Sequence, residues 1–150
     1  SQVKANQENI RKRAAEMGFL FHPEGRKRVY NTFHAHRLLH WAQAEHGLDA
    51  QYKLKKELFA TYFTLAVSVD DPNNLLAAVE RAGLPSERAR AILESDEYSQ
   101  AVKDQKKKYT ELGINSVPAI ILDNKYMIQG AQAPEMFASA LRDCAQESNH

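Results

Sequence analysis

Cysteine is nearly absent from the sequence, which holds a single one, Cys144, among 150 residues. One cysteine cannot form an internal disulfide, a CxxC pair or a four-cysteine zinc site. No base stands beside it to activate the thiol, so Cys144 is not expected to act as a nucleophile. We therefore assign no catalytic residue within these 150 residues.

An excess of one charge and long apolar runs are also missing. The 20 Lys and Arg residues nearly balance the 19 Asp and Glu residues, leaving a net charge of +1. This balance excludes a basic nucleic-acid arm and an acidic tail. No apolar run approaches the roughly 18 to 20 residues that a membrane-spanning helix needs. Neither nucleic acid nor a membrane is expected as a partner.

Signatures of common ligand sites are lacking as well. The sequence has no glycine-rich phosphate loop, no G-x-S-x-G motif and no calcium-binding loop. His36 and His40 have the i, i+4 spacing of metal ligands on a helix. No acidic residue lies between them as in a metalloprotease motif, and no third ligand is identifiable, so we predict no metal site.

Helix-forming patterns fill most of the chain. Hydrophobic residues make up 43% of the sequence, enough for a core. Apolar spacing near 3.6 residues and capping residues such as Asn31, Asp71 and Ser95 define the helices. The predicted helices cover residues 2–17, 33–46, 50–66, 72–82, 86–94, 96–112 and a last segment that begins at Pro134.

The last third of the chain contains the only strand signals. Residues 117–122 are apolar and partly β-branched, residues 123–125 are typical of a turn, and residues 126–129 alternate weakly, which predicts a β-hairpin. A lone hairpin is marginal in water, and the first strand is apolar on both faces, as in a covered sheet. Further strands are therefore expected, from another copy of the chain or from sequence that precedes Ser1.

Pro118 stands at the start of this apolar strand. Only an X–Pro bond makes the cis isomer accessible at low cost, and a strand-opening proline is a position where it is plausible. We predict a cis Val117–Pro118 bond; an ordinary trans proline is the alternative.

Helix, proline loop, hairpin and closing helix together resemble the C-terminal β-β-α half of a thioredoxin fold. The helices before them resemble the helical insertion of DsbA-like oxidoreductases. Two separated motifs, NTFHAHRLLHWA at 31–42 and IQGAQAPEMF at 128–137, are similar to the FrnE branch of that family.

The resemblance implies an α/β, thioredoxin-like fold interrupted by an all-helical insertion and mostly α by content. Residues 1–112 would form the insertion and residues 113–150 the β-β-α half. It also implies a protein thiol-disulfide oxidoreductase with no cofactor, acting on protein thiols or disulfides. The family's reactive CxxC is missing here, and exchange needs an attacking thiolate and normally a second cysteine. We expect this chain to be the C-terminal portion of such an enzyme and to be inactive alone.

Site residues follow from the same resemblance. The family's substrate-facing loop corresponds to Ser116, Val117 and Pro118. The helix start that overhangs this loop corresponds to Asn31, Thr32, His36 and Arg37, for which capping and surface roles are the alternative.

Two other functions remain open at this point. A glutathione-dependent isomerase or transferase branch of the same fold uses a serine and binds glutathione beside the proline. A non-catalytic binding module could instead form a homodimer through exposed strand edges. The FrnE branch, which the chain resembles, is mostly bacterial and often cytoplasmic. The resemblance therefore implies a bacterial cytoplasmic location.

Overall fold

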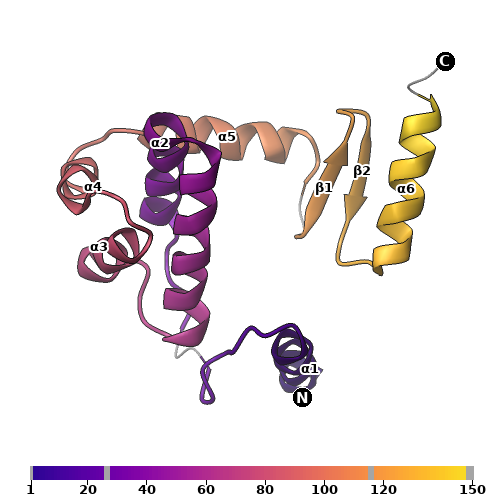
Figure 1. Cartoon of the computed structure of the whole chain (residues 1–150), viewed down its shortest axis with the longest axis horizontal. Helices are drawn as coiled ribbons and strands as arrows, with labels where there is room; N and C mark the ends of the chain where they lie inside the picture. Colours follow the sequence, from indigo (N-terminus) through magenta and orange to yellow (C-terminus); the bar gives the residue numbers. More distant parts are fainter. Residues whose placement is uncertain (1, 26–27, 115–116, 148–150) are drawn as a thin grey trace. The chain divides into compact units, whose positions relative to one another are not determined.

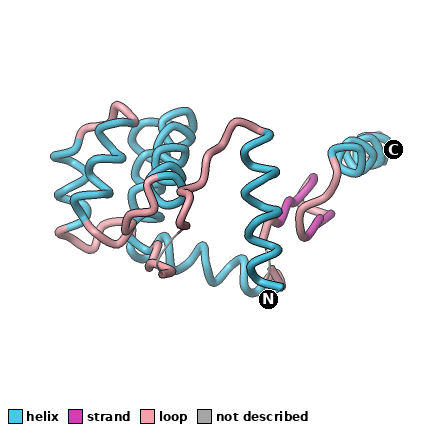
Figure 2. The backbone as a smooth tube through the Cα atoms, turned by 90° about the horizontal axis from the view of Figure 1, so that it is seen from below, coloured by secondary structure: helices cyan, strands magenta, loops and turns pink. Residues whose placement is uncertain are grey.

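Helices dominate the computed structural model, which describes residues 2–25, 28–114 and 117–147 (Figures 1 and 2). The elements in chain order are α1 (Gln2–Glu16), α2 (Phe33–Phe59), the π-helix η1 (Ala60–Thr64), α3 (Pro72–Arg81), α4 (Ser86–Leu93), α5 (Ser99–Glu111), β1 (Ala119–Leu122), β2 (Tyr126–Gln129) and α6 (Pro134–Glu147). The chain divides into two compact units, residues 1–103 and 104–150. We call them the helical unit and the hairpin unit. The boundary between the two units falls within α5, whereas the boundary predicted from the sequence follows residue 112.

Helix α2 bends sharply at Gly47, whose φ of 87° and ψ of 177° are not helical. The side-chain amide of Gln51 donates to the Leu39 carbonyl at 3.1 Å and to the Gln43 side chain at 2.9 Å. Residues twelve apart on a straight helix would be about 18 Å apart. The two halves of α2 therefore fold back side by side, and the predicted helix end at Gly47 is confirmed.

The core of the helical unit is built from α2, α3 and α4. Trp41, Leu54 and Val79 are fully buried within one continuous apolar cluster. Helix α3 begins as the sequence predicts, because the Asp71 carboxylate accepts a hydrogen bond from the Asn73 N–H at 2.9 Å and Pro72 occupies the first turn.

Two predicted helix boundaries differ from the structure by more than one residue. Ser95 does not cap α5: its hydroxyl accepts the Glu97 N–H at 3.2 Å, and Tyr98, with a φ of 60°, delays the helix to Ser99. The α-helix predicted to reach residue 66 ends at Phe59 and continues as η1. Local hydrogen bonding by a serine competes with helix formation, which explains the first difference.

The segment after α1 packs against η1. The His22 N–H donates to the Phe63 carbonyl at 2.8 Å, and the Thr64 hydroxyl donates to the Leu20 carbonyl at 2.7 Å. The rings of Phe21 and Phe63 meet edge to face with centroids 5.2 Å apart. Residues 19–22 are thus held against η1 by both backbone and aromatic contacts.

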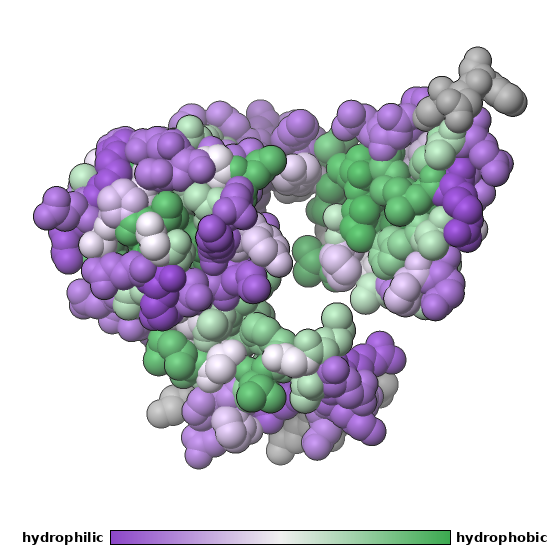
Figure 3. Space-filling view, in the orientation of Figure 1, coloured by the Kyte–Doolittle hydropathy of each residue, from purple (hydrophilic) through white to green (hydrophobic). Residues whose placement is uncertain are grey.

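Within the hairpin unit, β1 and β2 pair antiparallel, with Ala119 opposite Gln129 and Leu122 opposite Tyr126. Asp123 and Asn124 both have positive φ, and the Lys125 N–H donates to the Leu122 carbonyl at 3.0 Å. This is the backbone that tight hairpin turns require. The space-filling view shows apolar surface over the hairpin and polar surface along the outer side of α6 (Figure 3). In the described residues the sheet has these two strands.

No described helix is both long and apolar enough to cross a membrane.

Candidate functional site

The Val117–Pro118 loop leads directly into β1. The Val117–Pro118 peptide bond is cis, and Val117 is 89% exposed. The Pro118 carbonyl accepts a hydrogen bond from the Gly130 N–H at 2.7 Å, which fixes the loop to the end of β2. Ser116, the first residue predicted for this loop, lies outside the described residues.

The backbone of Val117 is available for pairing. Within the part of the chain that the structure describes, neither its N–H nor its carbonyl has a hydrogen-bond partner. The register between the two strands begins at Ala119, two residues later. Backbone that is exposed next to the start of a strand and keeps an unpaired donor and acceptor can pair with an extended peptide in the manner of an added strand.

The helix start predicted to belong to the same site lies in the helical unit. The Asn31 side chain accepts the Phe33 N–H at 2.9 Å, and the Thr32 carbonyl accepts the His36 N–H at 3.0 Å. Thr32 occupies the N-cap position without a side-chain hydrogen bond. Both residues remain exposed, and the geometry gives Asn31 a capping role.

His36 lies one turn into α2 and is exposed. Desolvation by the surrounding atoms lowers its pKa, and the charges of Lys55 and His40 lower it further. The fold-back at Gly47 explains the proximity of Lys55: it lies one helical turn beyond Gln51, which contacts Leu39. The linear spacing pairs His36 only with His40, because nothing in it indicates a lysine 19 positions away.

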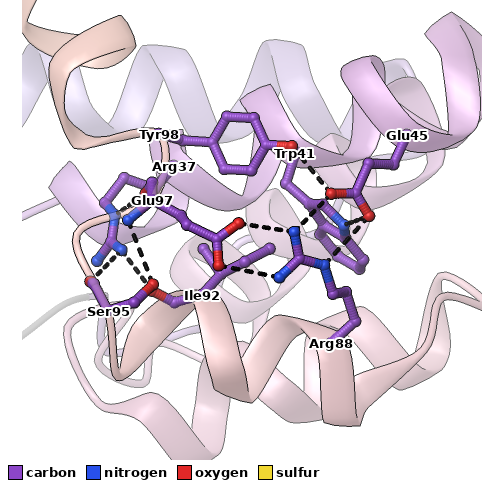
Figure 4. A network of polar contacts seen from close by, with 8 residues as sticks. All are labelled: Arg37, Trp41, Glu45, Arg88, Ile92, Ser95, Glu97 and Tyr98. Carbon is purple, nitrogen blue, oxygen red and sulfur yellow. Dashed lines mark hydrogen bonds and ion pairs between the residues drawn. The ribbon is translucent and has the colours of Figure 1, made fainter.

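Arg37 is only 2% exposed and is held by backbone carbonyls (Figure 4). Its guanidinium donates to the Glu97 carbonyl at 2.9 Å, the Ser95 carbonyl at 2.5 Å and the Ile92 carbonyl. A further nitrogen contacts His34 Nδ1 at 3.0 Å. The guanidinium therefore organises the connection between α4 and α5, and its burial does not favour the substrate-facing role that the sequence suggested.

A second arginine anchors the same connection from the outside (Figure 4). Arg88 on α4 forms ion pairs at 2.7 Å with both Glu45 and Glu97. Glu45 also accepts the Trp41 ring N–H at 2.9 Å and the Tyr98 hydroxyl at 3.0 Å. Hydrogen bonds from Arg88, Trp41 and Tyr98 lower the pKa of Glu45 to about 2, with Arg88 contributing most. Only the i, i+4 spacing of Trp41 and Glu45 marks this network in the sequence, so the network was not predicted.

Metal-ligating side chains do not gather into a site within the described residues, where no group of three His, Cys, Asp or Glu side chains is arranged to hold an ion. The Cys144 thiol lies half-buried on α6.

A cis-proline loop that leads into a hairpin and a closing helix, preceded by a helical insertion, defines a thioredoxin-fold protein of the DsbA type. A family model described as the DSBA-like thioredoxin domain matches residues 1–142, so the chain belongs to the DSBA-like thioredoxin domain family.

Among solved structures, a probable DsbA oxidoreductase from Streptomyces coelicolor is similar to the chain, with a TM-score of 0.84 and 30% identity. The match covers 97% of this chain and 62% of that chain. No curated protein sequence matches the chain. The predicted family and the mostly helical, thioredoxin-like fold are confirmed; assignment to the FrnE branch stays a prediction.

Proposed function

We propose that this chain is the substrate-facing part of a protein thiol-disulfide oxidoreductase. The observation that carries the proposal is Val117 beside Pro118 at the start of β1, which is largely exposed and whose backbone has no hydrogen-bond partner among the described residues. Membership of the DSBA-like family supports the class of reaction. An extended segment of the substrate pairs with Val117, which presents the substrate's sulfur atoms to the reactive pair.

The reactive pair comes from outside these 150 residues. Exchange proceeds by attack of a thiolate on a disulfide and needs a second thiol to resolve the mixed disulfide. Cys144 alone, on α6, supplies one sulfur. The role proposed for this chain is therefore to bind and orient protein thiols or disulfides.

The first experiment is a thiol count on the unfolded natural gene product, before and after reduction. Two or more thiols beyond Cys144, appearing mainly after reduction, are expected. A count of Cys144 alone would exclude dithiol exchange. Glutathione binding by that same protein would then favour the isomerase or transferase branch of the fold.

A second experiment tests the role of Val117 in the same full-length product. Val117→Pro removes the backbone N–H, whereas Val117→Ala keeps it and serves as the matched control. One hydrogen bond is worth about 0.5 to 1.5 kcal/mol, so the proline variant should reduce disulfides of insulin up to about tenfold more slowly. The alanine variant should remain within about twofold of the parent. Equal rates for both variants, with unchanged thermal unfolding, would refute substrate pairing at Val117.

A further inference from the structure

A groove of about 500 Å³ lies between α1 and the connection that follows it, within the helical unit. Its apolar lining comes from Ile10, Phe21, Val29 and Phe63. Ile10 is 57% exposed and Val29 is 82% exposed, so both present apolar surface to solvent. The volume falls in the range of roughly 300 to 1,000 Å³ that is typical of small-molecule sites.

The walls of this groove are fixed by contacts across it. The Arg11 guanidinium donates to the Pro23 carbonyl at 2.9 Å, which ties α1 to the connection. A Cβ at Gly25 would collide with the same guanidinium, so the backbone approaches Arg11 closely there. On the other side, the backbone hydrogen bond between His22 and Phe63 holds the aromatic wall.

Among the described residues, two arginines line the groove. Arg11 and Arg28 both line it, and neither forms an ion pair with any described residue. Arg28 lies over the Tyr30 ring, with its guanidinium carbon 5.0 Å from the centroid. Glu24 also lines the groove but pairs with neither arginine. A guanidinium has five donors, and Arg11 uses one nitrogen for Pro23, so donors remain for a ligand.

We propose that this groove binds a small aromatic carboxylate. The ring packs against Ile10, Phe21 and Phe63, where edge-to-face contacts extend the existing pair of phenylalanine rings. The carboxylate accepts hydrogen bonds from Arg11 and Arg28, whose planar forks match carboxylate oxygens. This site is separate from the Val117 loop and does not depend on the proposed function.

The test is an NMR titration of the 150-residue chain with 2-naphthoate, with uncharged 2-naphthamide as the matched probe. Saturable amide shifts are expected at Ile10, Arg11, Gly25 and Val29. The amide should bind more weakly than the acid. Exposed ion pairs contribute up to about 1 kcal/mol. Arg11→Gln and Arg28→Gln should therefore each lower the affinity for 2-naphthoate about three- to fivefold.

Two further variants make the result decisive. Arg13→Gln, on the exposed surface of α1 outside the groove lining, should leave the affinity unchanged. Ile10→Asp should abolish binding while leaving the fold intact, because Ile10 is largely exposed. Shifts confined to the hairpin unit, equal binding of acid and amide, or no saturable shift would each overturn the proposal.

Discussion

Arg37 on α2 donates to the carbonyl of Glu97, 60 positions further along the chain, at 2.9 Å. Since the same guanidinium also reaches Ser95 and Ile92, one buried side chain fixes the whole connection between α4 and α5. Charged residues are rarely buried without partners, and here backbone carbonyls supply them.

Replacing Arg37 with Leu should destabilise the helical unit strongly. The change leaves buried carbonyls without donors, and each unsatisfied group costs roughly 1 to 3 kcal/mol. We expect a loss of about 3 kcal/mol, measured as a lower urea midpoint by circular dichroism. The control is Arg90→Leu on the exposed side of α4, which should change little. Comparable midpoints for the two variants would show that the Arg37 contacts contribute no stability.

Protonation of Glu45 at acidic pH should lower the free energy of unfolding. Its folded pKa of about 2 lies below the ordinary value of 4.5. A lowered carboxyl pKa adds stability above the unfolded pKa, and this stability is lost as the pH falls from about 5 towards 2. The urea midpoint of the parent should therefore fall more steeply across this range than that of Glu45→Gln. If the urea midpoints of the parent and of Glu45→Gln fell in parallel with pH, the lowered pKa of Glu45 would be contradicted.

The N-cap of α3 should by itself contribute a measurable amount to the free energy of unfolding. Asp71→Ala removes the acceptor for the Asn73 N–H, and loss of an N-cap costs typically about 1 kcal/mol. Urea unfolding should detect this loss. The neighbouring Asp70→Ala provides the control, since the Asp70 side chain is exposed and makes no described hydrogen bond. If both variants lose the same stability, local charge rather than capping is responsible.

The hairpin should promote self-association of the isolated chain. Ile121 in β1 is 41% exposed, and an uncovered strand with apolar side chains is a template for pairing. Sedimentation should show a concentration-dependent rise in mass, and Ile121→Lys should reduce it. Leu48→Lys, at a 69% exposed position in the helical unit, is the matched control. A monomer at every concentration would rule out pairing through this edge.

Local signals carried most of what the sequence could predict. Gly47 ends a helix because it can take a positive φ, and Asp71 with Pro72 starts one because of short-range capping. Val117 and Pro118 were recognisable from a motif of a few residues. Each of these depends on neighbours within about four positions.

The remaining features depend on contacts between distant residues. Arg88 meets Glu45 from 43 positions away, and Arg37 meets Glu97 from 60 positions away. Neither pairing is marked by a periodic pattern or a characteristic spacing in the sequence. The burial of Arg37 and the lowered pKa of Glu45 therefore could not be predicted. The groove beside α1 likewise requires the aromatic contact between Phe21 and Phe63.

The fold-back of α2 has a chemical consequence for His36. Desolvation, Lys55 and His40 all lower the pKa of His36, which favours the uncharged form of its imidazole. An uncharged imidazole carries a lone pair on one nitrogen. In its uncharged form His36 gives this surface of the helical unit a hydrogen-bond acceptor for a group that brings an O–H, N–H or S–H.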